Sequence, residues 1–323
     1  MIEIFAMALF ALGLSIMAFV DAFWGEQIRR SRWSILRYIR KPARSPTWTY
    51  LKRDKRAWVG IALIIVIVGI AIFASFIAPY GINDSVGPIK APPSRQFLFG
   101  TDGQGRDVFS RVIYGSWDSL EVALLLLVVE TSIGIILGLV AGFYGGWVDE
   151  LVMRAVDIAL SFPGLVLAAV FVGFFGPGLR NLIIALSLTG WAPFARITRA
   201  QTLMVKEEVY VESARAIGEK DRTIIFKYIL PNSMSPLIVM ATMTIPAAIL
   251  LTASMSFLGL GVQPPSPAWG MMLNEAIPFF RAAWWTAVFP GVAIMISVLG
   301  FNFLGDALRD ALDPRLRAYR VEG

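Results

Sequence analysis

The chain contains no cysteine and no histidine among its 323 residues, and only 16% of its residues are charged. Without cysteine, disulfide bonds and a thiol nucleophile are excluded. Without either residue type, the chain lacks the usual transition-metal ligands, zinc-protease motifs and a Ser-His-Asp triad. These absences exclude most metal-dependent and nucleophilic enzyme chemistry, and we expect no metal site.

Apolar residues, by contrast, are abundant. They make up 57% of the chain, and the mean hydropathy is +0.67. The apolar runs are continuous rather than alternating, which favours membrane-spanning helices over a β-barrel. We therefore expect an all-α integral membrane protein that contacts the lipid bilayer. The net charge is +6, and the basic residues cluster beside the apolar runs. This arrangement is typical of cytoplasmic membrane loops and does not predict nucleic-acid binding.

Seven segments are predicted to span the membrane: residues 2–24, 58–78, 119–142, 156–175, 182–197, 236–258 and 284–305. Residues 26–57 carry eleven Lys and Arg, and such a segment stays in the cytoplasm. This places the N-terminus outside and the C-terminus in the cytoplasm. The alternative for the basic segment is an amphipathic helix lying on the membrane. The expected parts are therefore an N-terminal span (1–25), the basic segment (26–57), a transmembrane domain (58–308) and a cytoplasmic tail (309–323).

Two predictions concern the start of the third span. Residues 99–116 are expected to form a turn that leads into an amphipathic helix on the surface. Within them, the sequence DGQGRD at residues 102–107 resembles a calcium loop only faintly, because its oxygen ligands are too few. A turn and a helix cap are the preferred interpretation.

Two further predictions concern the fourth span. Residues 144–154 are expected to form a short polar turn, and the span that follows is expected to kink near Pro163 and Gly164. Asp157 lies three residues after Arg154, so a local ion pair at the membrane surface is the preferred interpretation.

A polar insert, residues 200–232, separates the fifth and sixth spans and has helical periodicity of its own. Gly218 is predicted to end a first short helix by adopting a left-handed conformation. Asp221 is predicted to help begin a second helix, and Pro231 to end it. Two short helices joined by a glycine would form a compact structure.

The second helix of the insert carries an apolar stripe: Ile224, Ile225, Tyr228 and Ile229. A stripe with a charged border suits a groove on a partner protein. It equally suits a helix pair that rests on the lipid headgroups. The residues alone leave both interpretations open.

Within the third span, Gly134, Gly138 and Gly142 stand four residues apart and predict close packing against another helix. Glu130 lies in the apolar middle of the same span. It could line a substrate pathway, but it lies one turn before Gly134, so structural pairing is at least equally favoured.

Thr244, Thr252 and Ser256 give the sixth span polar faces. They could line a hydrated substrate path. Such side chains also bond back to the carbonyl groups of their own helix.

The polar insert resembles the EAA signature of binding-protein-dependent ABC transporter permeases. The matching residues are Glu212, Ser213, Ala214, Gly218, Leu230 and Pro231. Ser213 stands where the signature has alanine, and Tyr228 where it has isoleucine. In that family the loop is the coupling region that sits on the ATPase subunit, so the resemblance implies an ATPase-coupling role for these residues and for Asp221.

Other segments resemble the C-type permease subunit of dipeptide, oligopeptide and nickel importers. They are FGTDGQGRDVFSRVIYGS, YGGWVDELVMRAVDIALSFPGL, SFLGLGVQPPSPAWGMML and LGDALRDALDPRLR, and the resemblance covers residues 51–317. Trp117 departs from the family, whose members often have a basic residue there. The resemblance implies a six-helix type I ABC importer permease core, to which the span at 2–24 adds one extra N-terminal transmembrane helix.

The resemblance also implies a function, ATP-driven import across the cell membrane. The chain has no Walker A loop, so ATP and magnesium are expected on two separate ATPase subunits, and no cofactor on this chain. A homologous permease and an extracytoplasmic solute-binding protein are the other implied partners. Residues 101–106 and 263–269 are weaker candidates for contacts with the binding protein or the partner permease.

Several alternatives stay open for the transported solute and for the function. Peptides are the first expectation, and oligosaccharides or chelated nickel are alternatives within the same family. A stand-alone channel or secondary transporter is a second class of function, although Glu130 is the one serious candidate for a charged relay in mid-span. A membrane enzyme is disfavoured by the missing histidine and cysteine.

Overall fold

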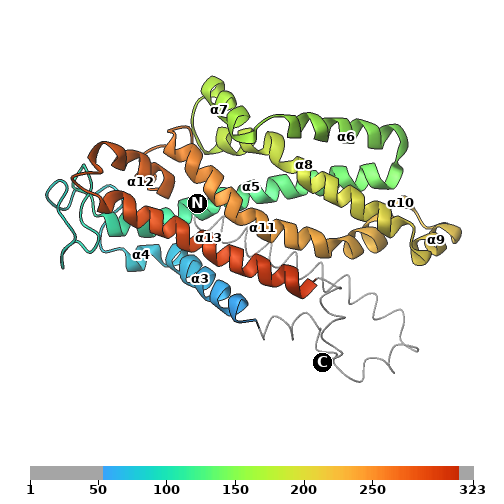
Figure 1. The fold of residues 1–323 in the computed structure, drawn as a ribbon, viewed down its shortest axis with the longest axis horizontal. Helices are drawn as coiled ribbons and strands as arrows, with labels where there is room; N and C mark the ends of the chain where they lie inside the picture. The colour runs from blue at the N-terminus through green and yellow to red at the C-terminus, as the bar shows by residue number, and fades with distance from the viewer. Residues whose placement is uncertain (1–53, 313–323) are drawn as a thin grey trace. The chain divides into compact units, whose positions relative to one another are not determined.

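The computed structural model describes residues 54–312, and every regular element in this range is a helix (Figure 1). The elements are α3 (Lys55–Ile72), α4 (Ala74–Ile77), α5 (Val108–Tyr144), α6 (Gly146–Ser161), α7 (Gly164–Phe175), α8 (Leu179–Lys206), α9 (Val209–Ala216), α10 (Asp221–Thr223), the π-helical η1 (Ile224–Ile229), α11 (Leu230–Phe257), α12 (Trp269–Ala276), the 3-10 turn η2 (Ile277–Phe279) and α13 (Trp285–Leu312). The predicted all-α fold is confirmed. The predicted N-terminal span, most of the basic segment and most of the tail lie outside the described residues.

Membrane-spanning length and apolarity are found in four of these helical stretches: α3, α5, the continuous run Asp221–Phe257, and α13. The pair α6 and α7 forms a fifth if it counts as one bent span. The predicted fifth span, residues 182–197, lies within α8, which is too polar to pass the same test. The polar residues of α8 are tolerated because other helices pack around it, and a helix covered by protein does not need an apolar surface all round.

Helix α5 begins at the predicted cap. The Asp107 carboxylate accepts the backbone N–H of Ser110 at 2.8 Å, so the interpretation of DGQGRD as a turn and helix cap is confirmed. From Val108 the helix runs for 37 residues without a break. The prediction of a separate surface helix is wrong, because Val108 and Arg111 are buried. Contacts with α12 and α13, which follow much later in the sequence, cover this first part of α5.

The connection between α5 and α6 is shorter than predicted. Gly145 and Gly146 both have positive φ angles, of 68° and 55°, and α6 starts at once. Residues 144–154 are therefore mostly helix, and the prediction of a polar turn is wrong. The predicted kink is confirmed as a break, with α6 and α7 meeting at 84°. Phe162 is extended, as expected for a residue that precedes a proline.

Close packing of α5 against α8 confirms the predicted glycine ridge. A Cβ atom on Gly138 would lie 2.5 Å from the carbonyl oxygen of Ala195, and one on Gly142 would lie 2.7 Å from Cβ of Thr202. Both distances are too short for a real side chain. The ridge therefore serves a contact within this chain, and it brings α5 and α8 closer together than any larger residue would permit.

Helices α3, α11 and α13 pack together on another side of α5. At Gly60 of α3, a Cβ atom would lie 2.8 Å from the backbone nitrogen of Leu304 in α13. The guanidinium of Arg56 lies 3.1 Å from the Asp310 carboxylate, which joins the ends of the same two helices. This exposed pair adds little stability, so glycine-mediated packing holds the two helices together.

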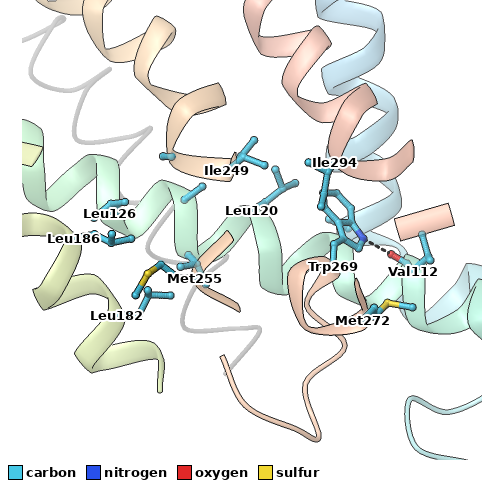
Figure 2. Packing of buried hydrophobic residues seen from close by; sticks show 14 of the residues in the cluster. Val112, Leu120, Leu126, Leu182, Leu186, Ile249, Met255, Trp269, Met272 and Ile294 are labelled. Carbon is cyan, nitrogen blue, oxygen red and sulfur yellow. Dashed lines mark hydrogen bonds between the residues drawn. The ribbon is translucent and has the colours of Figure 1, made fainter. Parts of the chain in front are cut away.

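The core lies where α5, α8, α11, α12 and α13 meet (Figure 2). Trp269 of α12 is 2% exposed, and its Nε1 donates to the carbonyl oxygen of Val112 at 3.0 Å. A buried tryptophan usually needs such a partner for its indole N–H. The remaining labelled core residues are Leu120, Leu126, Leu182, Leu186, Ile249, Met255, Met272 and Ile294.

One predicted ion pair is wrong. Asp157 in α6 pairs with Arg196 of α8 at 2.8 Å, and Arg154 lies 3.9 Å from Glu150 instead. The side of α6 that carries Asp157 faces α8, which is a contact between residues 39 positions apart. Sequence spacing along one helix gave no information about it.

Two structured regions lie at opposite ends of the helix bundle (Figure 1). Helices α9 and α10 occupy one end. Helix α12 and the irregular segment that precedes α5 occupy the other. The long helices α5 and α11 run between the two ends, α8 leads into α9, and α13 begins beside α12.

Candidate functional site

The polar insert begins as the last turns of α8 and then folds into a compact knob, residues 207–230. Helix α9 ends at Gly218, whose φ angle is +79°. The N–H of Gly218 donates to the carbonyl of Arg215 at 3.0 Å, and that of Glu219 donates to the carbonyl of Ala214 at 3.1 Å. These two bonds make a Schellman motif, so the predicted left-handed helix end at Gly218 is confirmed.

The second half of the knob differs from the prediction. Asp221 lies in the first turn of α10, where a carboxylate is favourable, although the N-cap position belongs to Lys220. Pro231 does not end the second helix, because η1 passes directly into α11. The N–H of Leu230 donates to Ile225, five residues back. A π turn directs its bonds to the fifth residue back, which relieves the clash of a proline ring with the carbonyl four residues earlier.

The underside of the knob is a small apolar core of its own. Val211 and Ala214 of α9 are buried together with three isoleucines of η1, Ile224, Ile225 and Ile229. They pack against the ends of α5 and α8, through Leu139, Phe143 and Val205. The predicted stripe is therefore a buried face, and the ends of α5 and α8 cover it, which neither of the two open interpretations had included. Helical periodicity shows that a face is buried and says nothing about what covers it.

The outward surface of the knob is formed by other residues. Val209, Ile217 and Phe226 are exposed by 74%, 77% and 55%. Glu212 and Arg222 are also exposed and place charges on the same segment. Large apolar side chains on an exposed polar segment are typical of a docking surface. This surface, and not the isoleucine stripe, is available to a partner or to lipid headgroups.

Two basic side chains, Lys206 at the end of α8 and Arg215 in the knob, contact the end of α5. Lys206 donates to the carbonyl oxygen of Phe143 at 2.7 Å, which satisfies an otherwise unpaired carbonyl at the end of α5. The guanidinium carbon of Arg215 lies 5.4 Å from the centre of the Phe143 ring. Such a cation–π contact contributes about 0.5–1 kcal/mol at an exposed site. The knob is therefore fixed relative to the end of α5.

The residues of the EAA-like signature fall into two groups. Glu212 and Ser213 are exposed on α9, and the Ser213 hydroxyl donates back to the carbonyl of Val209 at 2.8 Å. Ala214 is buried and Leu230 is half-buried, and both belong to the apolar underside. The first group is therefore available for contacts, and the second group supports the knob from below.

The predicted substrate-pathway residues do not lie together. Glu130 is 4% exposed and packs against Gly190 of α8, where a Cβ atom would collide with the Glu130 carboxyl group. This placement favours the structural alternative. Thr252 and Ser256 are buried and line a cavity of about 10 Å³, roughly the space of one water molecule. Thr244 is partly exposed, and both threonines donate back to their own helix, as one alternative predicted.

The opposite end of the bundle holds a buried ionic network that sequence reasoning missed. Oδ2 of Asp102 lies 2.6 Å from Nε of Arg106 and 2.7 Å from Nη1 of Arg111. Oε2 of Glu275 in α12 lies 2.8 Å from both guanidinium groups. Arg106 and Arg111 are 5% and 1% exposed. The four side chains join the segment before α5 to α12.

Asp102 stays charged in this network. Burial alone would raise the pKa of its carboxyl group, but hydrogen bonds from the backbone N–H groups of Gln104 and Arg106, with the charges of Arg106 and Arg111, lower it below its ordinary value. Of the external candidates at 101–106, Gln104 is exposed, while Thr101, Asp102 and Arg106 are buried. The spacing of Asp102 and Arg106 gave a local signal for pairing. Glu275, 169 residues after Arg106, gave none.

Similarity to known proteins covers most of the chain. Residues 134–318 match the family described as binding-protein-dependent transport system inner membrane component. Residues 45–93 match the N-terminal transmembrane domain of oligopeptide transport permease C. The first match contains the whole knob and the glycine ridge.

Among curated proteins, the chain is 43% identical over 270 residues to the dipeptide transport system permease protein DppC of Alkalihalophilus pseudofirmus, covering 83% of this chain and 88% of the relative. It is 40% identical over 296 residues to the glutathione transport system permease protein GsiD of Pectobacterium atrosepticum, covering 90% and 98%. The corresponding GsiD protein of Escherichia coli is 44% identical over 272 residues, covering 84% and 90%.

Among solved structures, a chain of the MetNI methionine ABC transporter in an inward-facing conformation has a similar fold. The TM-score is 0.51 at 22% identity, and the match covers 63% of this chain and 96% of that chain. This likeness concerns the fold alone. Because the family match exceeds half of the chain and the relatives are at least 40% identical over most of it, the chain belongs to the family of inner membrane components of binding-protein-dependent transport systems, among its ABC importer permeases.

Proposed function

We propose that the chain is the permease subunit of an ATP-driven importer. In this proposal it forms the translocation pathway with a homologous permease. Two separate ATPase subunits, which bind ATP and magnesium, act on the knob, and a solute-binding protein delivers solute at the opposite end. The chain itself performs no covalent chemistry. Family membership and the two opposed structured ends of the bundle support this arrangement.

The observation that carries the proposal is the construction of the knob. Its outward surface exposes Val209, Ile217 and Phe226, and its underside is packed on α5 and α8. It continues into α11 without a loop. A partner that moves this surface moves the ends of three long helices with it. The knob therefore suits mechanical coupling better than simple resting on lipid headgroups, which needs no such attachment.

The coupling residues have distinct parts in this proposal. Glu212 and Ser213 contact the ATPase, and Gly218 gives the knob its turn. Ala214, Leu230 and Pro231 set its position on the bundle, and Asp221 stabilises the start of the second helix. These assignments combine the structural placement of each residue with its match to the family signature.

The proposed orientation follows the positive-inside pattern, with the knob and the C-terminus in the cytoplasm and the N-terminus outside. Alternating access then requires the paired permeases to open toward one side at a time. The transported solute is proposed to be a peptide. Relatives named for dipeptide and for glutathione transport support peptides over oligosaccharides or chelated nickel.

A matched pair of glycines tests the coupling role. Gly218 and Gly259 both end a helix with a Schellman motif, at φ angles of 79° and 77°. At both positions no atom of the described residues lies within 4 Å of a Cβ atom. Valine at either position therefore causes the same local strain, about 1–2 kcal/mol from the left-handed conformation. The two variants differ in which end of the bundle they affect.

The experiment measures solute-stimulated ATP hydrolysis of the assembled complex in lipid. We expect Gly218→Val to assemble in the membrane and to lose stimulation, and Gly259→Val to keep most of it. Normal stimulation of the Gly218→Val complex would count against the coupling role. Equal loss in both variants would show a general effect of strain, and would also contradict the proposal.

A further inference from the structure

Helix α6 carries two different stripes on its exposed side. One stripe is polar and consists of Glu150, Arg154, Asp157 and Ser161. The other is apolar, runs beside it, and consists of Trp147, Leu151, Ala155, Ile158 and the capping residue Phe162. Both spacings are close to the period of about 3.6 residues per helical turn, so each stripe keeps to one side of the helix. A third side of α6 is buried against α5 and α8.

The polar stripe lies at a depth where the neighbouring helix α5 is apolar. Val156, next to Asp157, belongs to a buried cluster that includes Leu137 of α5. Leu137 lies seven residues before the end of α5, about 10 Å along the helix. Residues 131–144 of α5 contain no charged side chain, and α6 and α7 together have the length and apolarity of a bent span. The pair of Asp157 and Arg196 therefore lies within the membrane-spanning part of the bundle.

The charged side chains of this stripe are exposed in spite of their depth. Those of Asp157 and Arg196 are 63% and 55% exposed. Those of Glu150 and Arg154 are 72% and 75% exposed. Charged side chains within a span almost always face the interior of a bundle or a water-filled cavity, because contact with hydrocarbon is costly. A long arginine can extend its charge toward the membrane surface, but the short Asp157 side chain cannot. The polar stripe therefore needs water beside it rather than lipid tails.

We propose that the polar stripe of α6, together with Arg196 of α8, lines the water-filled translocation pathway, and that the apolar stripe lies outside it. The inference rests on the proposed function and deepens it by naming the wall that this chain contributes. Glu150 and Asp157 balance Arg154 and Arg196, so the wall has no net charge. Such a wall offers weak sites to both ends of a zwitterion such as a peptide, and weak binding at several sites lets a solute leave as well as enter.

Single cysteines test the inference, because the chain has no cysteine of its own. Ser161→Cys places a thiol on the polar stripe, and Ile158→Cys is the matched control on the apolar stripe. Both residues are exposed, and neither is charged. Ile158 lies nearer the start of α6, which adjoins the cytoplasmic end of α5 in the proposed orientation. If depth alone decided access to water, the control would therefore react faster.

The full complex is labelled in inverted membrane vesicles with a charged, membrane-impermeant methanethiosulfonate. Mass spectrometry of this chain follows the reaction, so cysteines of the partner subunits do not interfere. Without nucleotide, we expect Ser161→Cys to react at least about 10-fold faster than Ile158→Cys, because a charged reagent does not enter hydrocarbon. With ATP and vanadate, the rate for Ser161→Cys should change several-fold, because alternating access rearranges the walls of the pathway.

A second pair of variants repeats the comparison nearer the cytoplasm. Arg154→Cys lies on the polar stripe and Leu151→Cys on the apolar stripe, and the same order of rates is expected. This pair decides the matter if Ser161→Cys does not assemble.

Three results would overturn the inference. Equal labelling of the two stripes would place α6 in open water beside the membrane. No labelling of either stripe would place the polar stripe in a dry interface. A rate for Ser161→Cys that is the same with and without nucleotide would show a crevice that takes no part in transport. The comparison without nucleotide needs no ATP hydrolysis, so its failure is distinct from failure of the coupling test.

Discussion

Replacing Gly138 with alanine places a methyl group where α5 and α8 touch. The new Cβ atom would lie 2.5 Å from the carbonyl oxygen of Ala195 and 2.6 Å from Cβ of Thr198. Ordinary contacts between such atoms need about 3.5 Å, so the helices must separate by about 1 Å. Both neighbouring atoms belong to the rigid part of α8, and no flexible side chain can move aside.

The separation weakens packing along the whole contact between α5 and α8. A gap of about 0.5–1 Å loses a quarter to a half of the dispersion energy between facing atoms. Overpacking of this kind costs about 1–3 kcal/mol, which lowers the ratio of folded to unfolded chain about 5- to 150-fold. Gly134 and Gly142 lie one turn away on each side and depend on the same close approach.

Gly69→Ala in α3 is the matched control. No atom of residues 54–312 lies within 4 Å of a Cβ atom at Gly69, so alanine there adds only helix propensity, about 0.5–1 kcal/mol of stabilisation. Unfolding by sodium dodecyl sulfate in mixed micelles, followed by tryptophan fluorescence, gives a midpoint for each variant. Gly138→Ala should unfold at less detergent than the unmodified chain, and Gly69→Ala at the same amount or more. A Gly138→Ala midpoint equal to that of Gly69→Ala would refute the reasoning about the ridge.

Two further predictions concern charged groups. The pKa of the Asp102 carboxyl group is lower in the folded chain than in the unfolded one. Its contribution to stability is therefore present above its ordinary pKa of about 3.9 and is lost as the pH falls below about 4. Amide hydrogen exchange in the segment before α5 should rise below this pH, and Asp102→Asn should remove the pH dependence of the exchange. Arg199→Ala breaks a bidentate, half-buried pair with Asp149, at 2.5 Å for both bonds, and should cost about 1–3 kcal/mol. Arg196→Ala breaks an exposed pair with Asp157 and should change the free energy of unfolding by less than about 0.5 kcal/mol. Equal losses in the two arginine variants would contradict this difference.

Several features could be predicted because their cause is local. A long apolar run predicts a span regardless of its neighbours, as for α3 and α13. The break at Pro163 follows from the geometry of the proline ring and of the residue before it. Gly218 ends α9 because a left-handed helix end favours glycine. Spacing of small residues likewise predicted the ridge, since it reports the shape of one helix face.

Other features depended on distant parts of the chain. The isoleucines of η1 face inward because the ends of α5 and α8 offer them an apolar surface, which periodicity cannot show. A proline such as Pro231 usually signals a helix end, but the π turn before it relieves the clash between the proline ring and the preceding turn, so the helix continues. Arg111 looked like part of a surface helix, and its burial depends on Glu275 in a helix that follows much later. For the isoleucines and for Arg111, tertiary contacts decided which side chains are buried, and the local sequence does not show those contacts.

The uninterrupted passage from η1 into α11 has a mechanical consequence. Helix α11 has 28 residues, so it is a rod about 42 Å long. At its far end the Asn274 side chain of α12 donates to the carbonyl of Phe257 at 2.7 Å, next to Glu275 and its arginines. A displacement applied at the knob is therefore carried along one continuous helix toward this hydrogen bond. The helix can bend where Pro236 and Pro246 interrupt its hydrogen-bond ladder, so the stiffness at these two residues sets how far a push at one membrane surface travels toward the other.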